Sequence, residues 1–479
     1  MTTPTAAILG IDLGTTEVKV GLVGLDGRLL AIARAGYGLD VGPDGRAEQD
    51  AEAWWSAVVV GVHALRPPEA VDVVAIGVDG HGPTLVAVDA RGAAIRPAIT
   101  FLDTRSRTES EELAEATGIR GWALGPLPAA LWLERNEPDV AARACWYLTT
   151  WEWLAFRLTG VAAAPTVPGQ GRPDAAVVGA ATGLRVDRLP DATAMGGLVA
   201  TLSEVAADAL HLRAGIPVAG GTNDAFASYL GAGLTEAGDA YDPGGSAGGF
   251  GVYWDQPVEV AGAFVTPAPL AGLYSVGAAM ASTGRALDWF RDAVVGGSVT
   301  TEALLEEAGT TPPGADGVVF LPYLAGERSP IWDPGATGAF VGLTLGHGRS
   351  HLTRAILEAS AFAIRHVAEP MLAAGVRVSA MRACGGPARS ETWNQIKADV
   401  TGFPVLVPAV LETAVLGSAI LGAVAIGASP DVQTAVRSMT RIERRLEPRP
   451  ETRETYDRAY GIYAGLYPAL RPLLAEPRR

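Results

Sequence analysis

The stretch Ile8–Leu30, ILGIDLGTTEVKVGLVGLDGRLL, decides how the first part of the chain folds. Two runs of alternating apolar residues are separated by a short turn, DLGTT. Alternation with a period of two is typical of β-strands, so the stretch predicts an antiparallel hairpin. The turn also carries a carboxylate, a glycine and two hydroxyls, which a plain hairpin does not need.

The chemistry of this turn suits a phosphate group. Gly14 lets backbone amides approach a ligand closely, and Thr15 and Thr16 add hydroxyl donors. Lys19 follows on the returning strand, and Asp12 suits a hydrated Mg²⁺ that bridges a polyphosphate. An ordinary β-turn is the alternative, and the turn alone does not decide between them.

The composition bounds the class of protein. With 479 residues, 48% of them hydrophobic and 19% charged, the chain is long enough for two globular domains of about 200 residues each. Its net charge of −15, from 37 basic and 52 acidic residues, argues against nucleic acid or an anionic membrane as a main partner. Any anion must then be bound by local amides and a few placed cations.

Other features predict a reducing, cytoplasmic setting. Cys145 and Cys384 lie far apart and have no metal-type spacing. The N-terminus shows no signal-peptide pattern. The uncharged run Ala414–Pro430 is shorter than the ~20 apolar residues of a membrane helix, and it predicts a tightly packed interior helix.

Helical and strand patterns alternate along the chain, which predicts an α/β fold. After the hairpin we expect a helix within 47–65 and a buried strand at 71–80. Residues 161–191 are rich in Gly, Pro and Ala, and we expect a loop region there. The tail after Ser438 is rich in Arg and Glu and predicts a surface helix.

The hairpin motif recurs near the middle of the chain. In Ala237–Trp254, AGDAYDPGGSAGGFGVYW, Asp242 falls with Asp12, Gly244 with Gly14 and Ser246 with Thr16. The repeat predicts two similar domains, residues 1–236 and 237–479, and two glycine-rich turns that clamp one nucleotide. Walker-type GxxxxGK[ST] and protein-kinase HRD and DFG motifs are absent from the sequence, so ATP would be bound on another scaffold.

A single carboxylate, Asp224, stands among small apolar residues where a predicted strand meets a helix. It is either a helix N-cap or a working base. The second reading requires burial, which would raise its pKa so that it can accept a proton from an alcohol during phosphoryl transfer.

Polar residues also follow other predicted strands. His81, Asp103 and Arg105 lie at strand ends, where open α/β sheets tend to bind ligands, although solvated loop residues would look the same. The segment Cys384–Gln395, CGGPARSETWNQ, is a strand, a glycine turn and a helix start that could back an adenine or a ribose.

Together these segments resemble the FGGY family of carbohydrate kinases, within the actin, hexokinase and heat-shock ATPase superfamily. The segment Gly338–Glu358, GAFVGLTLGHGRSHLTRAILE, fits the second signature of that family, and FLPYLAGERSP, EQDAEAWW and GGPARSETWNQIKADVTGFPV are similar to further segments, nearest to xylulose kinases. The resemblance spans about residues 8–428. It implies two ribonuclease H-like domains with an interdomain cleft, ATP as phosphoryl donor, Mg²⁺, and a small sugar as acceptor.

The resemblance also implies roles for individual residues. Asp224 stands at the position of the catalytic base, and Asp12 at that of the aspartate beside the phosphates and Mg²⁺. Sugar contacts are implied for Gly80, His81 and Phe101, with Asp103 nearby. The implied nucleotide-binding residues are Gly14, Thr15, Thr16, Lys19, Gly244, Gly245, Ser246, Gly284, Asp288, Gly386, Pro387 and Ser390.

The chain departs from the xylulose-kinase pattern at several positions. GTSG is replaced by GSAG in the second loop, and Ala225 follows the catalytic Asp where Asn is usual. The family's QMHG and LWNDGR read DGHG and TFLDTR here. These changes bear on sugar identity more than on ATP use, because they fall at the expected sugar pocket.

The resemblance therefore implies a cytoplasmic sugar kinase that phosphorylates a pentulose such as xylulose, and a homodimer would be in keeping with the family. Kinases for ribulose, a deoxyketose, erythritol or glycerol are the nearest alternatives. A non-catalytic, ATP-dependent conformational module is an alternative from another class.

Overall fold

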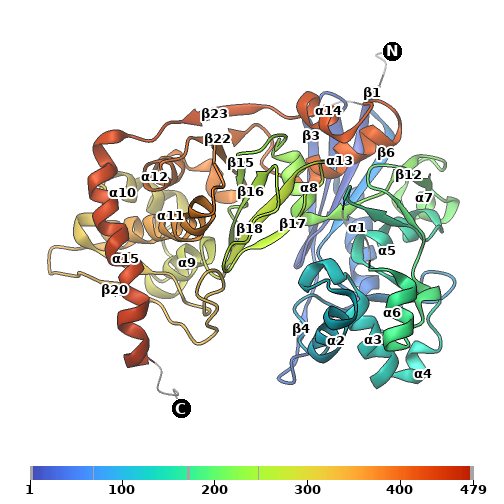
Figure 1. Cartoon of the computed structure of the whole chain (residues 1–479). Coiled ribbons are helices and arrows are strands. Elements are labelled where there is room, and N and C mark those ends of the chain that lie inside the picture. Colours follow the sequence, from blue (N-terminus) through green and yellow to red (C-terminus); the bar gives the residue numbers. More distant parts are fainter. Residues whose placement is uncertain (1–3, 68–69, 170–172, 246, 475–479) are drawn as a thin grey trace. The chain divides into compact units, whose positions relative to one another are not determined.

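A computed structural model describes residues 4–67, 70–169, 173–245 and 247–474 of the chain (Figure 1). The chain forms two compact units. The first comprises Met1–Gly233, Pro267–Ala271 and Glu412–Thr440, and the second comprises Leu234–Thr266, Gly272–Leu411 and Arg441–Arg479.

The main sheet of the first unit has seven strands among the described residues, and six of them run in the order β12-β13-β6-β1-β2-β3, with β14 beside β6. The three N-terminal strands form an antiparallel meander, and β6 and β13 add in parallel. The strands are β1 (Thr5–Leu13), β2 (Glu17–Gly24), β3 (Leu29–Gly36), β6 (Val71–Gly80), β12 (Leu198–Thr201), β13 (Pro217–Ala219) and β14 (Thr222–Asn223).

The predicted hairpin is confirmed. β1 and β2 pair in antiparallel register, with Asp12 opposite Lys19 and Leu13 opposite Val18. The predicted strand at 71–80 is β6, and it pairs in parallel with β1 so that Asp79 lies beside Asp12. Both strands therefore end at the same edge of the sheet.

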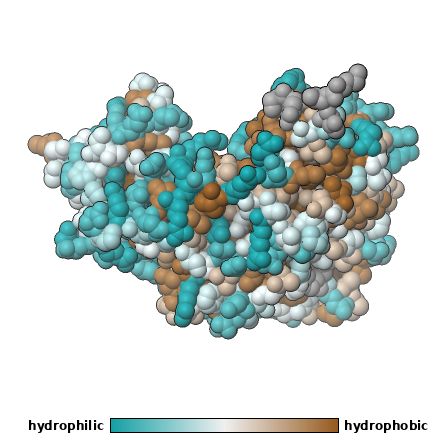
Figure 2. Space-filling model, turned by 90° about the horizontal axis from the view of Figure 1, so that it is seen from above, coloured by the Kyte–Doolittle hydropathy of each residue, from teal (hydrophilic) through white to brown (hydrophobic). Residues whose placement is uncertain are grey.

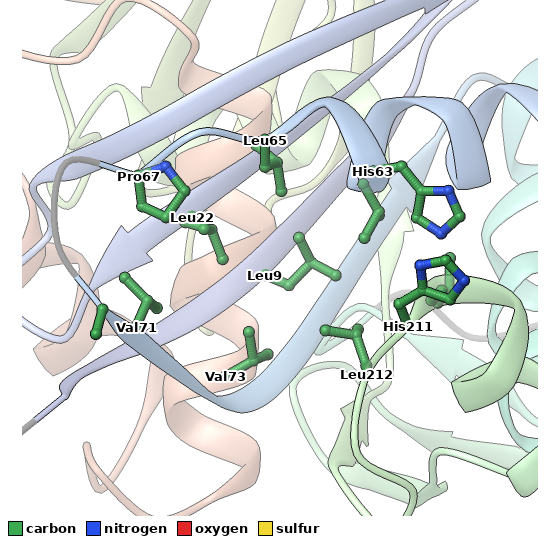
Figure 3. A pocket seen from close by; sticks show the side chains of 12 residues that line it. Leu9, Leu22, His63, Leu65, Pro67, Val71, Val73, His211 and Leu212 are labelled. Atoms are coloured by element: carbon green, nitrogen blue, oxygen red, sulfur yellow. The ribbon is translucent and has the colours of Figure 1, made fainter.

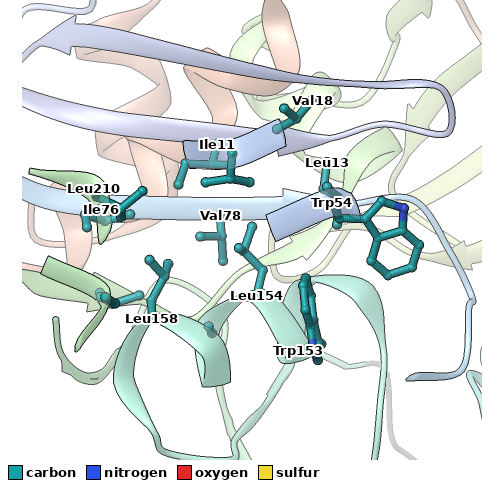
Figure 4. Close-up of a cluster of buried hydrophobic side chains, with 14 of the residues drawn as sticks. Ile11, Leu13, Val18, Trp54, Ile76, Val78, Trp153, Leu154, Leu158 and Leu210 are labelled. Carbon is teal, nitrogen blue, oxygen red and sulfur yellow. The ribbon is translucent and has the colours of Figure 1, made fainter. Parts of the chain in front are cut away.

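One face of this sheet forms the core of the first unit. The alternate residues Leu9, Ile11 and Leu13 of β1 pack with Ile76 and Val78 of β6 (Figure 4). Side chains of three helices cover this face. These helices are α1 (Ala51–Ala64), α5 (Thr150–Thr159) and α7 (Glu204–Leu210).

Helix α13 (Thr413–Ala425) covers the opposite face of the sheet and packs on α8 (Asp224–Gly231). The approach is close enough to need glycine, since a Cβ on Gly77 would lie 1.8 Å from the Ser418 carbonyl oxygen. A Cβ on Gly417 would lie 1.9 Å from the Ala227 carbonyl oxygen. The prediction of a tightly packed interior helix in this run is confirmed.

Smaller elements complete the first unit. Its short strands are β4 (Asp40–Val41), β5 (Ala47–Gln49), β7 (Val86–Val88), β8 (Ala98–Ile99), β9 (Trp146–Leu148), β10 (Ala164–Thr166) and β11 (Ala192–Ala194). Its remaining helices are α2 (Arg107–Thr117), α3 (Leu127–Asn136), α4 (Pro138–Ala141), α6 (Ala175–Thr182) and α14 (Val432–Met439).

The expectation of a loop region at 161–191 was wrong in part. The segment contains β10 and helix α6, although residues 170–172 lie outside the described residues. Asp174 caps α6 by accepting from the amides of Ala176 and Val177, and Gly183 ends it with φ +77°. The helix buries only Val178, so its sequence lacks the apolar periodicity that would have marked it.

The second unit repeats the strand order of the first. Its described seven-stranded sheet runs β17-β18-β16-β15-β21-β22-β23, with an antiparallel hairpin of β15 and β16 and a parallel neighbour, β21. The strands are β15 (Asp239–Asp242), β16 (Gly248–Trp254), β17 (Phe264–Pro267), β18 (Tyr274–Met280), β21 (Ala380–Ala383), β22 (Val405–Pro408) and β23 (Ile442–Leu446). The predicted pair of similar α/β domains agrees with this repeat.

The second unit also contains a two-stranded sheet and five α-helices among its described residues. The strands are β19 (Val319–Leu321) and β20 (Ala339–Val341), and the helices are α9 (Gly284–Trp289), α10 (Thr301–Thr310), α11 (Arg349–Ala373), α12 (Glu391–Thr401) and α15 (Arg453–Leu474).

The prediction of a surface helix after Ser438 was wrong in part. Residues 442–446 form β23, which pairs antiparallel with β22 at the edge of the sheet and carries its charges toward solvent. The helix α15 follows, but it is not only a surface helix. It buries Tyr456, Tyr460 and Tyr463 in a cluster with Phe362.

The face seen in Figure 2 mixes hydrophilic and hydrophobic residues. Among the described helices, none is long and apolar enough to cross a membrane. A cavity of about 370 Å³ opens in the first unit between apolar side chains such as Leu9 and Leu22, with the rings of His63 and His211 stacked 4.1 Å apart at its edge (Figure 3). None of the predicted site residues lines this cavity.

Candidate active site

Three charged residues of the first unit project from one face of its sheet. Because Leu13, Val18 and Val78 point into the core of the other face, the alternation of strands places their neighbours Asp12, Lys19 and Asp79 on the face that α13 covers. Three charged groups therefore meet where β1 and β6 end.

Asp12 and Asp79 are both buried, with 3% and 0% of their surface exposed. The Nζ of Lys19 lies 3.3 Å from Oδ2 of Asp12. The hydroxyl of Ser418 on α13 donates to Oδ2 of Asp79, whereas Oδ1 has no hydrogen-bond partner among the described residues. Burial, followed by the neighbouring Asp12 carboxylate, raises the pKa of Asp79 well above its usual range.

Asp224 is the first residue of α8, and it is not the N-cap. That role belongs to Asn223, whose side-chain oxygen accepts from the amide of Phe226 at 2.8 Å. The Asp224 carboxylate accepts from the amide of Ala225 at 2.8 Å. Burial, and then the charge of Asp12, raise the pKa of Asp224 to about 7. Such a pKa is suited to a general base at neutral pH.

The DLGTT turn is stabilised by one hydrogen bond within the hairpin and by two side chains from outside it. Within it, the amide of Gly14 donates to the Glu17 carbonyl at 3.1 Å. The hydroxyl of Tyr37 donates to the Gly14 carbonyl, and Nε2 of Gln49 donates to the Thr15 carbonyl at 2.8 Å. These contacts occupy the carbonyl oxygens of Gly14 and Thr15, while Thr16 is exposed.

A row of rings lies beside the end of β6. His81 is fully buried, and its ring contacts Trp54 (5.3 Å between centroids) and Phe101 (5.9 Å). Burial lowers the pKa of His81 to about 4, so the ring is neutral at pH 7. Its Nδ1 lies 3.2 Å from the hydroxyl of Thr84, and within the described residues its Nε2 has no hydrogen-bond partner.

Two other predicted sugar-site residues are constrained by their neighbours. A Cβ on Gly80 would lie 2.4 Å from the hydroxyl oxygen of Thr150, so this position can hold only glycine beside that threonine. The Asp103 carboxylate is 1% exposed, pairs with Arg105 at 2.6 Å and accepts from the amide of Ala47 at 2.9 Å. The Asp103 carboxylate oxygens are therefore already hydrogen-bonded within the protein.

The second unit brings the other predicted loops together. The amide of Gly284 donates to the Gly245 carbonyl at 3.3 Å, which joins the start of α9 to the second glycine turn. A Cβ on Gly244, whose φ is +57°, would lie 2.0 Å from the Cys384 carbonyl oxygen, next to the turn that holds Gly386. Ser246 lies outside the described residues.

The remaining predicted nucleotide-binding residues differ in their exposure and in their local hydrogen bonds. Gly386 is exposed, and the described atoms leave open space where its Cβ would be. Pro387 lies within the short 3₁₀ turn Gly386–Arg389, and Ser390 follows that turn, where its hydroxyl caps α12 by accepting from the Trp393 amide. Asp288 is on α9, is exposed and pairs with Arg291 at 3.2 Å.

The chemistry of Asp12 fits a magnesium ion that arrives with a nucleotide. The described residues contain no group of three or more His, Cys, Asp or Glu side chains that could hold a metal. Magnesium is commonly bound by one or two carboxylates together with substrate phosphates, and the Asp12 carboxylate can supply such a ligand.

Comparisons with known proteins identify the family. Residues 7–166 match the N-terminal domain, and residues 245–426 the C-terminal domain, of the FGGY family of carbohydrate kinases. The chain belongs to the FGGY family. A xylulose kinase of Escherichia coli (strain K12) is 31% identical over 419 residues, which cover 82% of this chain and 84% of that protein. The family resemblance of the sequence is thereby confirmed.

Two further proteins, a glycerol kinase and a second xylulose kinase, are similar to this chain over most of its length. A glycerol kinase of Thermus brockianus is 32% identical over 449 residues, 85% of this chain and 87% of that protein. The crystal structure of xylulose kinase from Rhodospirillum rubrum aligns with a TM-score of 0.79 and 30% identity, over 98% of this chain and all of that one. This FGGY protein is thus an ATP-dependent carbohydrate kinase with the two-domain fold of its family.

Several residues of this FGGY site were not singled out from the sequence. Tyr37, Gln49 and Asn223 hold the turn and helix start, and their partners are carbonyl or amide groups that the sequence does not reveal. For Asp79 the sequence does hold a signal, because this carboxylate stands at the penultimate position of β6, after the uncharged run Val73–Val78. Charges at such strand ends are candidates for ligand binding.

Proposed function

We propose that this kinase transfers the γ-phosphate of ATP to a hydroxyl of a small ketose, a pentulose such as xylulose. The observation that carries the proposal is the Asp224 carboxyl, which lies at the N-terminus of α8 beside Asp12 and has a pKa near 7. In this proposal residues 1–236 bind the sugar and contain the first phosphate loop, and residues 237–479 bind the nucleotide.

Asp224 accepts the proton of the sugar hydroxyl as that oxygen attacks phosphorus. Asp12 would hold a Mg²⁺ ion, which when bound would supply neutralisation of charge on the phosphates. Lys19 lies beside Asp12 and supplies the local cation. Backbone amides of the two glycine-rich turns donate to phosphate oxygens, apart from the Gly14 amide, which is bonded to the Glu17 carbonyl within the hairpin.

The sugar is oriented by the residues at the end of β6. The neutral His81 ring offers Nε2 to a sugar hydroxyl, and Phe101 presents an apolar surface next to it. Asp103 acts indirectly, since its bonds to Arg105 and to Ala47 fix the segment that carries Phe101. Cytoplasmic location and a homodimer stay predictions.

The test is ADP release over a panel of acceptors with ATP and Mg²⁺. We expect xylulose to give the highest kcat/KM, ahead of ribulose, gluconate, erythritol and glycerol. A preference for glycerol or erythritol would contradict the pentulose assignment. ADP release that no acceptor stimulates would contradict phosphoryl transfer to a sugar and would support a conformational ATPase module instead.

A further inference from the structure

A buried ion pair in the second unit links two loops that the sequence analysis treated separately. Asp242 is the last residue of β15 and is 4% exposed, and Lys397 lies in the second turn of α12 and is 2% exposed. The Nζ of Lys397 donates to Oδ2 of Asp242 and lies 5.6 Å from the centre of the Trp393 ring. A fully buried pair of this kind is uncommon, because both charges are removed from water.

Each partner is attached to a different nucleotide loop of the proposed site. Oδ1 of Asp242 accepts from the amide of Gly244 at 3.0 Å, so the carboxylate fixes the start of the second glycine turn. Lys397 belongs to the helix that begins at the Gly386–Ser390 turn. The ion pair therefore joins the predicted phosphate loop to the predicted adenosine loop.

The backbones of these loops are also in direct contact. A Cβ on Gly385 would lie 2.6 Å from the Pro243 carbonyl oxygen, and one on Gly244 would lie 2.0 Å from the Cys384 carbonyl oxygen. Contacts this close leave little room for either loop to shift alone. The ion pair between Asp242 and Lys397 therefore helps to set the spacing between these two loops.

The equivalent aspartate of the first unit has a different partner. Asp12 pairs with Lys19 from the adjacent strand at 3.3 Å, and the Lys19 side chain is 27% exposed. Asp242 instead has one oxygen on a buried ammonium and the other on a backbone amide. Both carboxylate oxygens of Asp242 are therefore hydrogen-bonded within the protein. This distinguishes Asp242 from Asp12, to which we assign the metal.

We propose that Asp242 and Lys397 form a positioning pair that holds the phosphate loop and the adenosine loop of the second unit at the spacing a nucleotide requires. This inference rests on the proposed function, because it assumes that these loops bind ATP. Neither residue touches the nucleotide. Their role is to keep the amides of the second glycine turn aimed at phosphate.

A second ion pair on β15 provides a control. Asp239, at the other end of β15, pairs with Arg382 of β21 at 2.6 Å, and the side chains are 14% and 11% exposed. That pair joins β15 to β21 and lies at the end of β15 away from the second glycine turn. Arg382→Met therefore removes an ion pair that is more exposed than that of Asp242 and Lys397 and does not link the two loops.

The experiment compares three variants with the unmodified enzyme. Lys397→Met leaves the Asp242 carboxylate buried without its cation, whereas Asp242→Asn/Lys397→Met removes both charges and keeps an oxygen for the Gly244 amide. Arg382→Met is the control. The measurements are Tm, the Kd of ADP by titration calorimetry, and KM for ATP against kcat.

We expect Lys397→Met to lower Tm and to weaken ADP binding at least ~10-fold, since an uncompensated buried charge displaces the loops. The double variant should regain most of the Tm but keep a Kd about 10-fold weaker, because the link between the loops is still missing. KM for ATP should rise in both, with kcat reduced less. Arg382→Met should lower Tm and leave the Kd of ADP unchanged.

Two results would overturn the inference. One is a double variant that binds ADP as tightly as the unmodified enzyme, and the other is an Arg382→Met variant that loses as much ADP affinity as Lys397→Met. Failure of the unmodified enzyme to bind ADP would overturn the proposed nucleotide site together with this inference, so the two failures are distinguishable.

Discussion

The carboxyl of Asp224 lies in surroundings that favour its neutral form. Burial and the nearby Asp12 charge raise its pKa to about 7, so at neutral pH a large fraction still holds a proton. The same shift that makes it a competent base also makes its ionised form costly for the fold. The ionised carboxylate of Asp224 is thus needed for activity but lowers the stability of the folded protein.

The first prediction is a pH profile. Because the base must be ionised, kcat/KM for the sugar should fall about tenfold per pH unit below an apparent pKa near 7 and reach a plateau above it. Initial rates between pH 5.5 and 9 at saturating ATP and Mg²⁺ measure this. A kcat/KM that stays constant down to pH 5.5, as expected for a base with the ordinary pKa of an exposed aspartate, would contradict the assignment.

The second prediction concerns stability. The pKa of Asp224 is about 7 in the folded protein, against an ordinary value of about 3.8 for an unfolded chain. The stability that this group contributes is therefore full below the lower pKa and is lost as pH rises toward the higher one. Asp224→Asn removes this loss. We expect its Tm at pH 8 to exceed that of the unmodified enzyme by a few degrees, corresponding to about 2 kcal/mol, and the gain to shrink toward pH 5.

A control for this stability change is Asp187→Asn. Asp187 is exposed, and its hydrogen bond with Arg185 lowers its pKa, so neutralising it should give no gain at any pH. Equal increases in Tm for both variants would show that the effect is one of general surface charge.

Among single residues, the sequence could identify Asp12 and Asp224 but not the whole site. Both are isolated charges among small or apolar neighbours, which is a local signal. The partner of Asp79 is Ser418, 339 positions away, and only folding brings them together. The pKa shifts have the same origin, because they depend on burial by distant segments.

Elements with a strong local period were the predictable part of the fold. The hairpin of β1 and β2, the strand β6 and the helices α1 and α11 follow from alternation or from helical spacing. The strand β23 was missed because an edge strand carries charges that disguise its period. The packing of α13 was foreseen from its composition, but the sheet it covers was not.

The third prediction compares two glycine-to-alanine changes. At Gly417 on α13 a methyl group would meet the Ala227 backbone of α8, so Gly417→Ala should cost about 1–3 kcal/mol and lower kcat by displacing Asp224. At Gly461 on α15 the described atoms leave the position open, so Gly461→Ala should stabilise by about 0.5–1 kcal/mol without changing kcat. Thermal unfolding and steady-state rates measure both.

If Gly417→Ala leaves kcat unchanged while Tm falls, the contact of α13 with α8 does not position the base. A loss of stability in Gly461→Ala would contradict the prediction, because it would show that a methyl group at this position meets a neighbouring group.

At the scale of the whole chain, two units carry sheets of the same strand order. The short echo of Asp12, Gly14 and Thr16 at Asp242, Gly244 and Ser246 predicted this repeat from the sequence. The membership of residues 412–440 in the first unit could not be predicted, because no local pattern shows which sheet a helix will cover. Likewise, sugar identity depends on side-chain positions in three dimensions.

The fourth prediction concerns metal removal. Since the described residues form no metal cage of their own, Mg²⁺ should be needed for turnover but not for folding. Excess EDTA should abolish sugar-dependent ADP release and leave the Tm of the nucleotide-free enzyme unchanged, and added Mg²⁺ should restore activity. A large fall in Tm with EDTA would indicate a structural metal instead.

The most direct test of the central claim is sugar-stimulated ADP release by Asp224→Asn, together with its Kd for ADP. If Asp224 is the base, turnover should fall by roughly 10²–10⁴-fold while ADP affinity stays within a few-fold of that of the unmodified enzyme. Turnover within tenfold of the unmodified enzyme would contradict the claim and remove Asp224 from the role of base.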